Sequence, residues 1–191
     1  MTKRGRLIAL EGGGSPAMEL TSKQLLRSLK KTDRNTGLSA WDASGLFYDM
    51  QQGDQTLGGA SPRVLMLLYA SDLAFRLRWQ IEPALESGQT VVASCYVESA
   101  VSFGRAVGIP RPWLRELFAF APKPDKVYRA PEEGLAFNRR GLPASSFLEF
   151  CFVQLRRSSG WWQTEDIRKL YFDQLRRLET RGGCELWLKQ S

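Results

Sequence analysis

The chain of 191 residues contains no histidine and only three cysteines. Without an imidazole, histidine metal ligands, Ser–His or Cys–His nucleophiles and imidazole acid–base catalysis are excluded. Cys95, Cys151 and Cys184 are odd in number, far apart and without Cys-x-x-Cys spacing, which argues against a disulfide framework or a zinc site. Any chemistry must therefore use carboxylates, lysines, arginines or backbone groups.

Long apolar runs are also absent. The longest, residues 64–70, is far shorter than the roughly 18 to 20 residues that span a bilayer. The basic N-terminus is followed by only four apolar residues, so we predict no secretory signal and expect a cytoplasmic protein without membrane association. Because 43% of the residues are hydrophobic, the chain can bury one substantial core, and we expect a single domain over residues 1–191.

The charge is strongly basic, with 27 lysines and arginines against 20 acidic residues and a net charge of +7. Such a charge fits either a polyanionic partner or a solvated basic surface. The basic residues are spread along the chain rather than set in one stripe interleaved with aromatic residues. We therefore do not expect nucleic acid binding.

Short apolar or β-branched runs alternate with helical patterns. The runs predict strands at residues 6–10, 90–94, 126–129 and 185–188. The helical patterns cover residues 15–31, 62–87, 113–121, 131–140, 147–155 and 164–178. Residues 32–61 are poor in periodicity, and we expect a long irregular connection there. The alternation predicts an α/β fold with a central parallel sheet.

The stretch after the first predicted strand has the outline of a phosphate-binding loop. It contains Gly12, Gly13, Gly14 and Ser15, followed by a proline. A working loop reads G-x-x-x-x-G-K-[ST], in which backbone N–H groups and the lysine hold phosphate and the hydroxyl holds magnesium. Counted from Gly12, the second glycine is Ala17, the lysine is Met18 and the hydroxyl residue is Glu19. The pattern indicates a degenerate phosphate loop.

Two interpretations of this stretch are open. In the first, it is an ordinary helix start, with Ser15 as the N-cap, Met18 packed on the sheet and the Glu19 carboxylate in the first turn. In the second, Glu19 ligates magnesium directly. That ligand would add negative charge beside a polyphosphate, with no lysine to offset it, so we favour the first interpretation.

Several segments occur together in an order that resembles the thymidylate kinase family of P-loop nucleoside monophosphate kinases. They are the helix segment at residues 65–75, the I-x-P-A-L-x-x-G stretch at 81–88 and the strand and turn at 90–99. The resemblance covers roughly residues 4–140. It implies a three-layer α/β/α, P-loop NTPase-like fold and pairing of two copies through helices. It places Tyr69 where an aromatic residue stacks on the nucleobase, with Phe103 as a second pocket residue.

The charged residues of the family pattern are missing. Ser94 and Cys95 occupy the positions of an Asp–Arg pair, Leu73 occupies that of a monophosphate-binding arginine, and residues 36–46 contain no arginine. We expect the family's closing helix to be absent after residues 185–188. Arg139 and Arg140 lie in the lid region. Tyr69 and Phe103 are also the kind of residue that fills a core.

We therefore expect a thymidylate kinase-like pseudoenzyme without a cofactor, in which nucleotide binding is weak or absent. It would act by binding or regulating a partner, which is a second copy in a homodimer or another protein. The alternative is a divergent nucleoside monophosphate kinase that transfers phosphate from ATP to dTMP or a similar nucleotide. That enzyme would need magnesium and would use Glu19 and the lid arginines.

Overall fold

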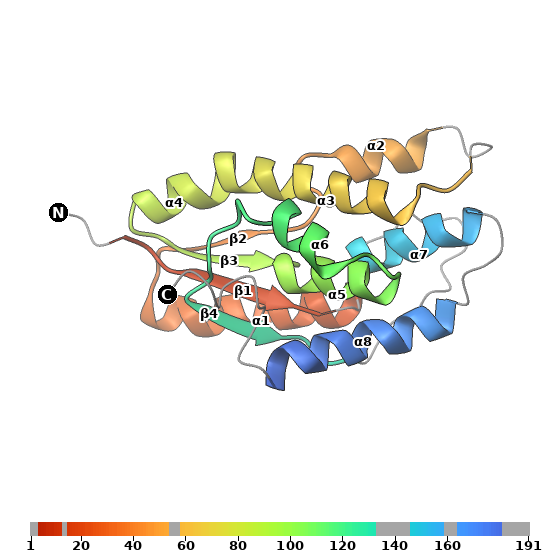
Figure 1. Cartoon of the computed structure of the whole chain (residues 1–191). Coiled ribbons are helices and arrows are strands. Elements are labelled where there is room, and N and C mark those ends of the chain that lie inside the picture. The colour runs from red at the N-terminus through yellow and green to blue at the C-terminus, as the bar shows by residue number, and fades with distance from the viewer. Residues whose placement is uncertain (1–3, 13–14, 54–57, 133–145, 159–163, 181–191) are drawn as a thin grey trace.

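The fold is seen in a computed structural model of the protein (Figure 1). The structure describes residues 4–12, 15–53, 58–132, 146–158 and 164–180. The predicted strand at 185–188 and nearly all of the predicted helix at 131–140 lie outside these residues. No helix within the described ranges is long and apolar enough to cross a membrane.

The described residues form a four-stranded parallel sheet in the order β2-β3-β1-β4. Its strands are β1 (Leu7–Glu11), β2 (Thr36–Ser39), β3 (Thr90–Ser94) and β4 (Lys126–Arg129). The predictions at 6–10, 90–94 and 126–129 are confirmed. The prediction of an irregular connection over 32–61 is wrong, because this segment contains β2 and a helix. β2 was missed because it is only four residues long and includes a glycine and an exposed leucine.

The helices of the described chain follow in this order: α1 (Ser15–Thr32), α2 (Leu46–Gln52), α3 (Pro62–Arg76), the π-helical turn η1 (Leu77–Ile81), α4 (Glu82–Glu86), α5 (Val97–Ala106), α6 (Arg111–Leu117), α7 (Phe147–Arg157) and α8 (Thr164–Thr180). The predicted long helix at 62–87 is thus a continuous helical run with a π turn inside it. The predicted pair at 147–155 and 164–178 corresponds to α7 and α8.

Both faces of the sheet are covered by helices (Figure 1). Ile8, Leu10 and Val92 pack in one cluster with apolar residues of α1. The alternate residues of β1 and β3, such as Leu7 and Val91, join the large core formed with the other helices. Burial on both faces explains why β1 and β3 are continuous apolar runs. The three-layer α/β/α fold is confirmed.

Candidate functional site

The first glycine of the loop has a structural reason to be glycine. Gly12 follows β1 and has a φ angle of +156°. A Cβ atom at this position would lie 2.9 Å from both the Ala130 Cβ and the Met18 Sδ, which is closer than side-chain atoms approach. Met18 is 5% exposed and packs with Ile8 and Leu10, so it has the packing role favoured by the sequence. Ala17 packs beside the same cluster.

The backbone of Gly12 is bound within the protein. Its N–H donates to the Ser99 hydroxyl at 3.2 Å, and its carbonyl accepts from the Tyr171 hydroxyl at 2.9 Å. Gly13, Gly14 and the side chain of Ser15 lie outside the described residues, so the predicted cap by Ser15 stays a prediction. The lid residues Arg139 and Arg140 also lie outside them.

Glu19 is not placed as predicted. Helix α1 begins at Ser15, so Glu19 lies beyond the first turn, which contains no acidic residue. Its carboxylate forms an ion pair with Lys23 at 2.5 Å, four residues further along the exposed face. The hydrogen bond from Lys23 lowers the pKa of Glu19. The expectation that Glu19 supplies the charge at the start of α1 is therefore wrong.

A buried carboxylate lies instead at the start of α5. Glu11, at the end of β1, is fully buried and accepts the backbone N–H groups of Tyr96, Glu98 and Ser99 at 2.9 to 3.1 Å. The Ser99 hydroxyl donates a fourth bond at 2.5 Å. Burial, together with the neighbouring Glu98, raises the pKa of Glu11 to about 7, although these hydrogen bonds lower it. Glu11 was not predicted from the sequence, although an acid that ends a buried strand is a usable signal.

The carboxylate of Glu98 has a cationic partner. Arg129, the last residue of β4, donates from Nη2 to Glu98 Oε2 at 2.5 Å. A second ion pair joins Arg129 to Glu179 at 4.0 Å. Glu98 and Ser99 therefore both serve the packing of α5 against β1 and β4.

A buried arginine joins the ends of two strands. Arg76, in the last turn of α3, is 0% exposed. Its guanidinium donates to the Ser39 hydroxyl and carbonyl at 3.0 and 2.8 Å. It also donates to the carbonyls of Ser94 and Cys95, both at 2.9 Å. Asp72 lies 4.0 Å away and completes the local charge balance. Arg76 thus fixes the carboxyl ends of β2 and β3, a role that apolar periodicity cannot reveal.

The predicted nucleobase residues are core residues in this structure. Tyr69, Leu73 and Phe103 are all 0% exposed. The Tyr69 hydroxyl donates to the carbonyls of Cys95 and Tyr96, the two residues that follow β3. The ring of Phe147 lies 4.3 Å from that of Tyr69 and 5.8 Å from that of Phe103. Phe147, from the start of α7, therefore fills the space between the two aromatics. A base could stack on Tyr69 only by displacing it.

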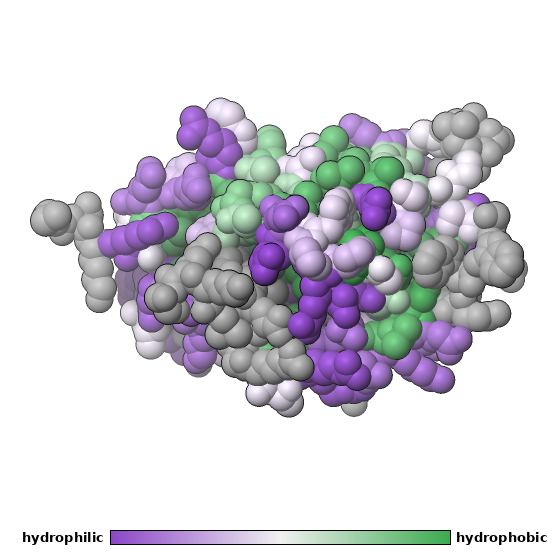
Figure 2. All heavy atoms as spheres, in the orientation of Figure 1, coloured by the Kyte–Doolittle hydropathy of each residue, from purple (hydrophilic) through white to green (hydrophobic). Residues whose placement is uncertain are grey.

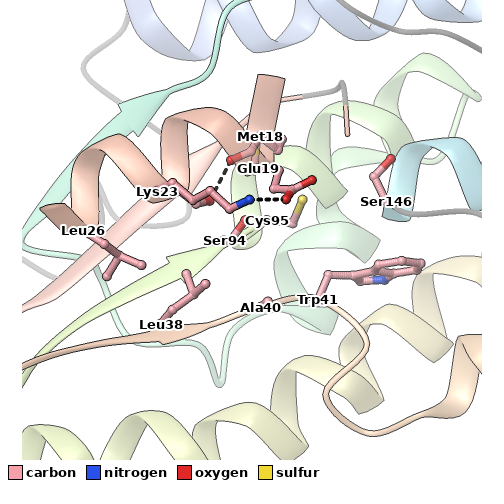
Figure 3. Close-up of a pocket in the computed structure, with 11 residues that line it drawn as sticks. Met18, Glu19, Lys23, Leu26, Leu38, Ala40, Trp41, Ser94, Cys95 and Ser146 are labelled. Atoms are coloured by element: carbon pink, nitrogen blue, oxygen red, sulfur yellow. Dashed lines mark hydrogen bonds and ion pairs between the residues drawn. The ribbon is translucent and has the colours of Figure 1, made fainter. Parts of the chain in front are cut away.

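A pocket of about 290 Å³ remains beside these residues, between α1 and the carboxyl ends of β2 and β3 (Figure 3). The residues that line it are Met18, Glu19, Ser22, Lys23, Leu26, Leu38, Ala40, Trp41, Ser94, Cys95 and Ser146. Burial raises the pKa of the Cys95 thiol to about 12, so this residue is a neutral thiol. The pocket includes Met18 and Glu19 but none of the three predicted nucleobase residues.

A parallel sheet with a glycine loop between its central strand and the first helix defines a P-loop NTPase-like α/β fold. The solved thymidylate kinase of Ehrlichia chaffeensis shares this fold, with a TM-score of 0.58 at 14% identity over 92% of this chain and 99% of that one. The chain is 27% identical over 127 residues to a probable thymidylate kinase of Pyrobaculum aerophilum, covering 62% of this chain and 60% of the relative.

A second sequence relative is the probable thymidylate kinase of Pyrococcus abyssi, which is 39% identical over 59 residues, or 31% of this chain and 29% of the relative. No protein-family model matches the chain. The sequence relatives support a relationship with the thymidylate kinase family, and the solved structure shows the shared fold. The chain spans about 60% of the length of the first curated relatives that it matches.

Proposed function

We propose that the protein is a thymidylate kinase-like pseudoenzyme that acts by binding a partner, in the first place a second copy of itself. One observation carries the proposal. Three cations at the loop and the strand ends are each bound to internal partners: Lys23 to Glu19, Arg129 to Glu98, and Arg76 to backbone carbonyls. A bound nucleotide would have to compete for each of them.

This matters because phosphoryl transfer relies on positioning and electrostatic stabilisation rather than on protein nucleophiles. Met18 supplies no charge at the loop, and Ser94 and Cys95 supply none at the end of β3. Phe147 also fills the space beside Tyr69 that a nucleobase would need. These features support loss of catalysis at the donor and the acceptor sides alike.

The outer face of α3 supports the proposal that the protein pairs with a second copy. Val64, Leu67, Phe75 and Trp79 are between 39% and 67% exposed and follow one another at helical spacing into η1. Figure 2 shows apolar atoms gathered over α3 at the upper edge of the molecule. A helix stripe of this kind favours an isologous contact, because the same patch meets itself in a two-fold dimer.

The test of inactivity is titration calorimetry with ATP and magnesium and with dTMP, next to a phosphorylation assay. We expect no heat and no turnover. In a parallel thermal measurement, a ligand at about 100 times its dissociation constant would add roughly 2.7 kcal/mol to the unfolding free energy. The relatives named as probable thymidylate kinases favour the alternative, a divergent nucleotide kinase. Turnover that Glu19→Gln abolishes would establish that enzyme and overturn the pseudoenzyme proposal.

The test of self-association is light scattering on Leu67→Glu. We expect a dimer for the parent protein and a monomer for this variant, because a charge in the stripe is desolvated on pairing. Leu170→Glu is the matched control, since Leu170 is 46% exposed on α8, away from the stripe. A monomeric parent protein would reject the homodimer and leave a different protein as the partner.

A further inference from the structure

The pocket between α1 and the strand ends lies where open parallel sheets bind ligands. The chain leaves β1 through α1 toward β2, whereas β3 leads through α5 toward β4 on the other side. Ligands of open α/β sheets bind outside the carboxyl ends of the strands, at the point where these connections diverge. This point lies between β1 and β3. Ser94 and Cys95, at and after the end of β3, border it, Trp41 follows the next strand β2, and all three line the pocket.

The lining is apolar over most of its surface. Met18 and Cys95, both 5% exposed, form the floor, and Leu38, 45% exposed, lies at the mouth. The indole of Trp41 forms a further wall (Figure 3). A thioether and an indole both make favourable contacts with aromatic rings.

The only charges among the described lining residues neutralise each other. Glu19 and Lys23 are 2.5 Å apart at the exposed side of the pocket, with 66% and 60% of their side chains exposed. No arginine is among the described residues of the lining. Within this described lining, a phosphate would meet the Glu19 carboxylate without an unpaired cation to offset the repulsion, whereas an uncharged molecule would meet no such barrier.

We propose that this pocket binds a flat, uncharged, two-ring aromatic molecule and discriminates against the phosphate ester of the same ring. A volume of about 290 Å³ is at the small end of ligand pockets and fits a molecule of this size. The proposal goes beyond the binding of a protein partner and does not depend on it, because it concerns a different surface from the α3 stripe.

The experiment uses 2-naphthol and 2-naphthyl phosphate, which share one ring system and differ in the phosphate. Titration calorimetry should show saturable binding of 2-naphthol that is at least about tenfold tighter than binding of the phosphate, equivalent to about 1.4 kcal/mol. Equal or tighter binding of the phosphate would overturn the proposal, as would the absence of saturable naphthol binding.

Two variants locate the site. Ala40→Trp fills the pocket from an exposed position and should weaken naphthol binding at least about tenfold. Leu20→Trp is the matched control, because Leu20 is 58% exposed on α1 and is not part of the lining. If Ala40→Trp binds naphthol as the parent protein does, the ligand lies elsewhere and the proposal fails.

A third variant tests the charge argument at the mouth. Leu38→Lys adds an unpaired cation at a half-exposed position, so the fold should tolerate it. We expect this variant to improve binding of 2-naphthyl phosphate relative to 2-naphthol by several-fold. An unchanged ratio would show that charge does not set the preference. This outcome is independent of dimerisation and of kinase activity, so its failure is distinguishable from failure of the pseudoenzyme proposal.

Discussion

Helices α1 and α5 both begin directly after neighbouring strands of the sheet, but the starts of the two helices are charged differently. At α5, three backbone N–H groups in and next to the first turn donate to the buried carboxylate of Glu11. At α1, no acidic residue lies in the first turn, and Glu19 is paired with Lys23 on the outer face. Negative charge at a helix N-terminus is stabilising. The chain therefore places a buried carboxyl group at the start of α5, away from the degenerate phosphate loop.

The strongest way to break this contrast is to remove the buried carboxyl group of Glu11. Glu11→Ala leaves the donors of Tyr96, Glu98 and Ser99 buried without an acceptor. Because each such group costs about 1 to 3 kcal/mol, we expect a loss on the order of 5 kcal/mol in urea unfolding. Glu11→Gln keeps one acceptor oxygen, so its unfolding free energy should fall clearly less. Equal stability of the alanine variant and the parent protein would show that Glu11 does not hold α5.

The next effect concerns the aromatic packing against α5. Phe147→Ala should lower the unfolding free energy by about 3 to 5 kcal/mol, because Phe147 is 1% exposed and contacts Tyr69 and Phe103. The variant also opens a space beside Tyr69. Titration calorimetry with thymidine then tests whether this space binds a nucleobase. Phe120→Ala is the control, because the ring that it truncates is 46% exposed. A small loss of stability would mean that Phe147 contributes little to the packing of this core.

The charge state of Glu11 predicts a pH dependence. Its pKa of about 7 in the folded protein lies above the ordinary value of 4.5, so the folded state binds more protons between these values. The stability contribution is therefore fully present below pH 4.5 and is lost as the pH rises through 7. Unfolding of the parent protein and of Glu11→Gln at pH 5 and pH 8 checks this. The glutamine variant should show a much smaller change, and a parent protein that gains stability toward pH 8 would contradict the sign.

A smaller effect is expected at the loop glycine. Tyr171→Phe removes the hydroxyl that donates to the Gly12 carbonyl at 2.9 Å while it keeps the ring in the core. We expect a loss of about 1 kcal/mol, typical of one buried hydrogen bond. Tyr128→Phe, on β4, serves as a control of the same chemistry. A loss comparable with that of Phe147→Ala would indicate that Tyr171 does more than bind this carbonyl.

The smallest effect is expected on the α1 side of the comparison. Glu19→Gln breaks only an exposed ion pair with Lys23, so its unfolding curve should coincide with that of the parent protein. Lys23→Met should behave in the same way. A marked destabilisation by Glu19→Gln would mean that this carboxylate supports the start of α1 after all, and the contrast with α5 would disappear.

The sequence predicts the parts of the fold that apolar patterns determine. β1, β3 and the long helical run through α3 are read from continuous or periodic apolar residues, and Met18 was expected to pack on the sheet. β2 was missed because a short edge strand with an exposed leucine has little apolar signal. Glu11 and Arg76 were also missed, because a buried polar residue depends on partners that are distant in the sequence.

The candidate site could be predicted only in part for the same reason. The resemblance identifies Tyr69 and Phe103 as neighbours, and the structure does bring them around one point. What occupies that point is Phe147, which comes from a later helix and has no local relation to either residue. The position of Glu19 was predicted wrongly because Ser15, expected as the cap, is already the first residue of α1, so the first turn ends before Glu19.

The π turn η1 determines how the two halves of the long helical run are rotated relative to each other. In it the N–H of Glu82 reaches back five residues to the carbonyl of Leu77, so the turn holds one residue more than an α-helix would. Deleting that residue would rotate α3 by about 100° relative to α4. Tyr69 and Arg76 would then turn away from the strand ends while Leu85 kept its place against β3. A single inserted residue thus sets the rotational register on which the carboxyl ends of β2 and β3 depend.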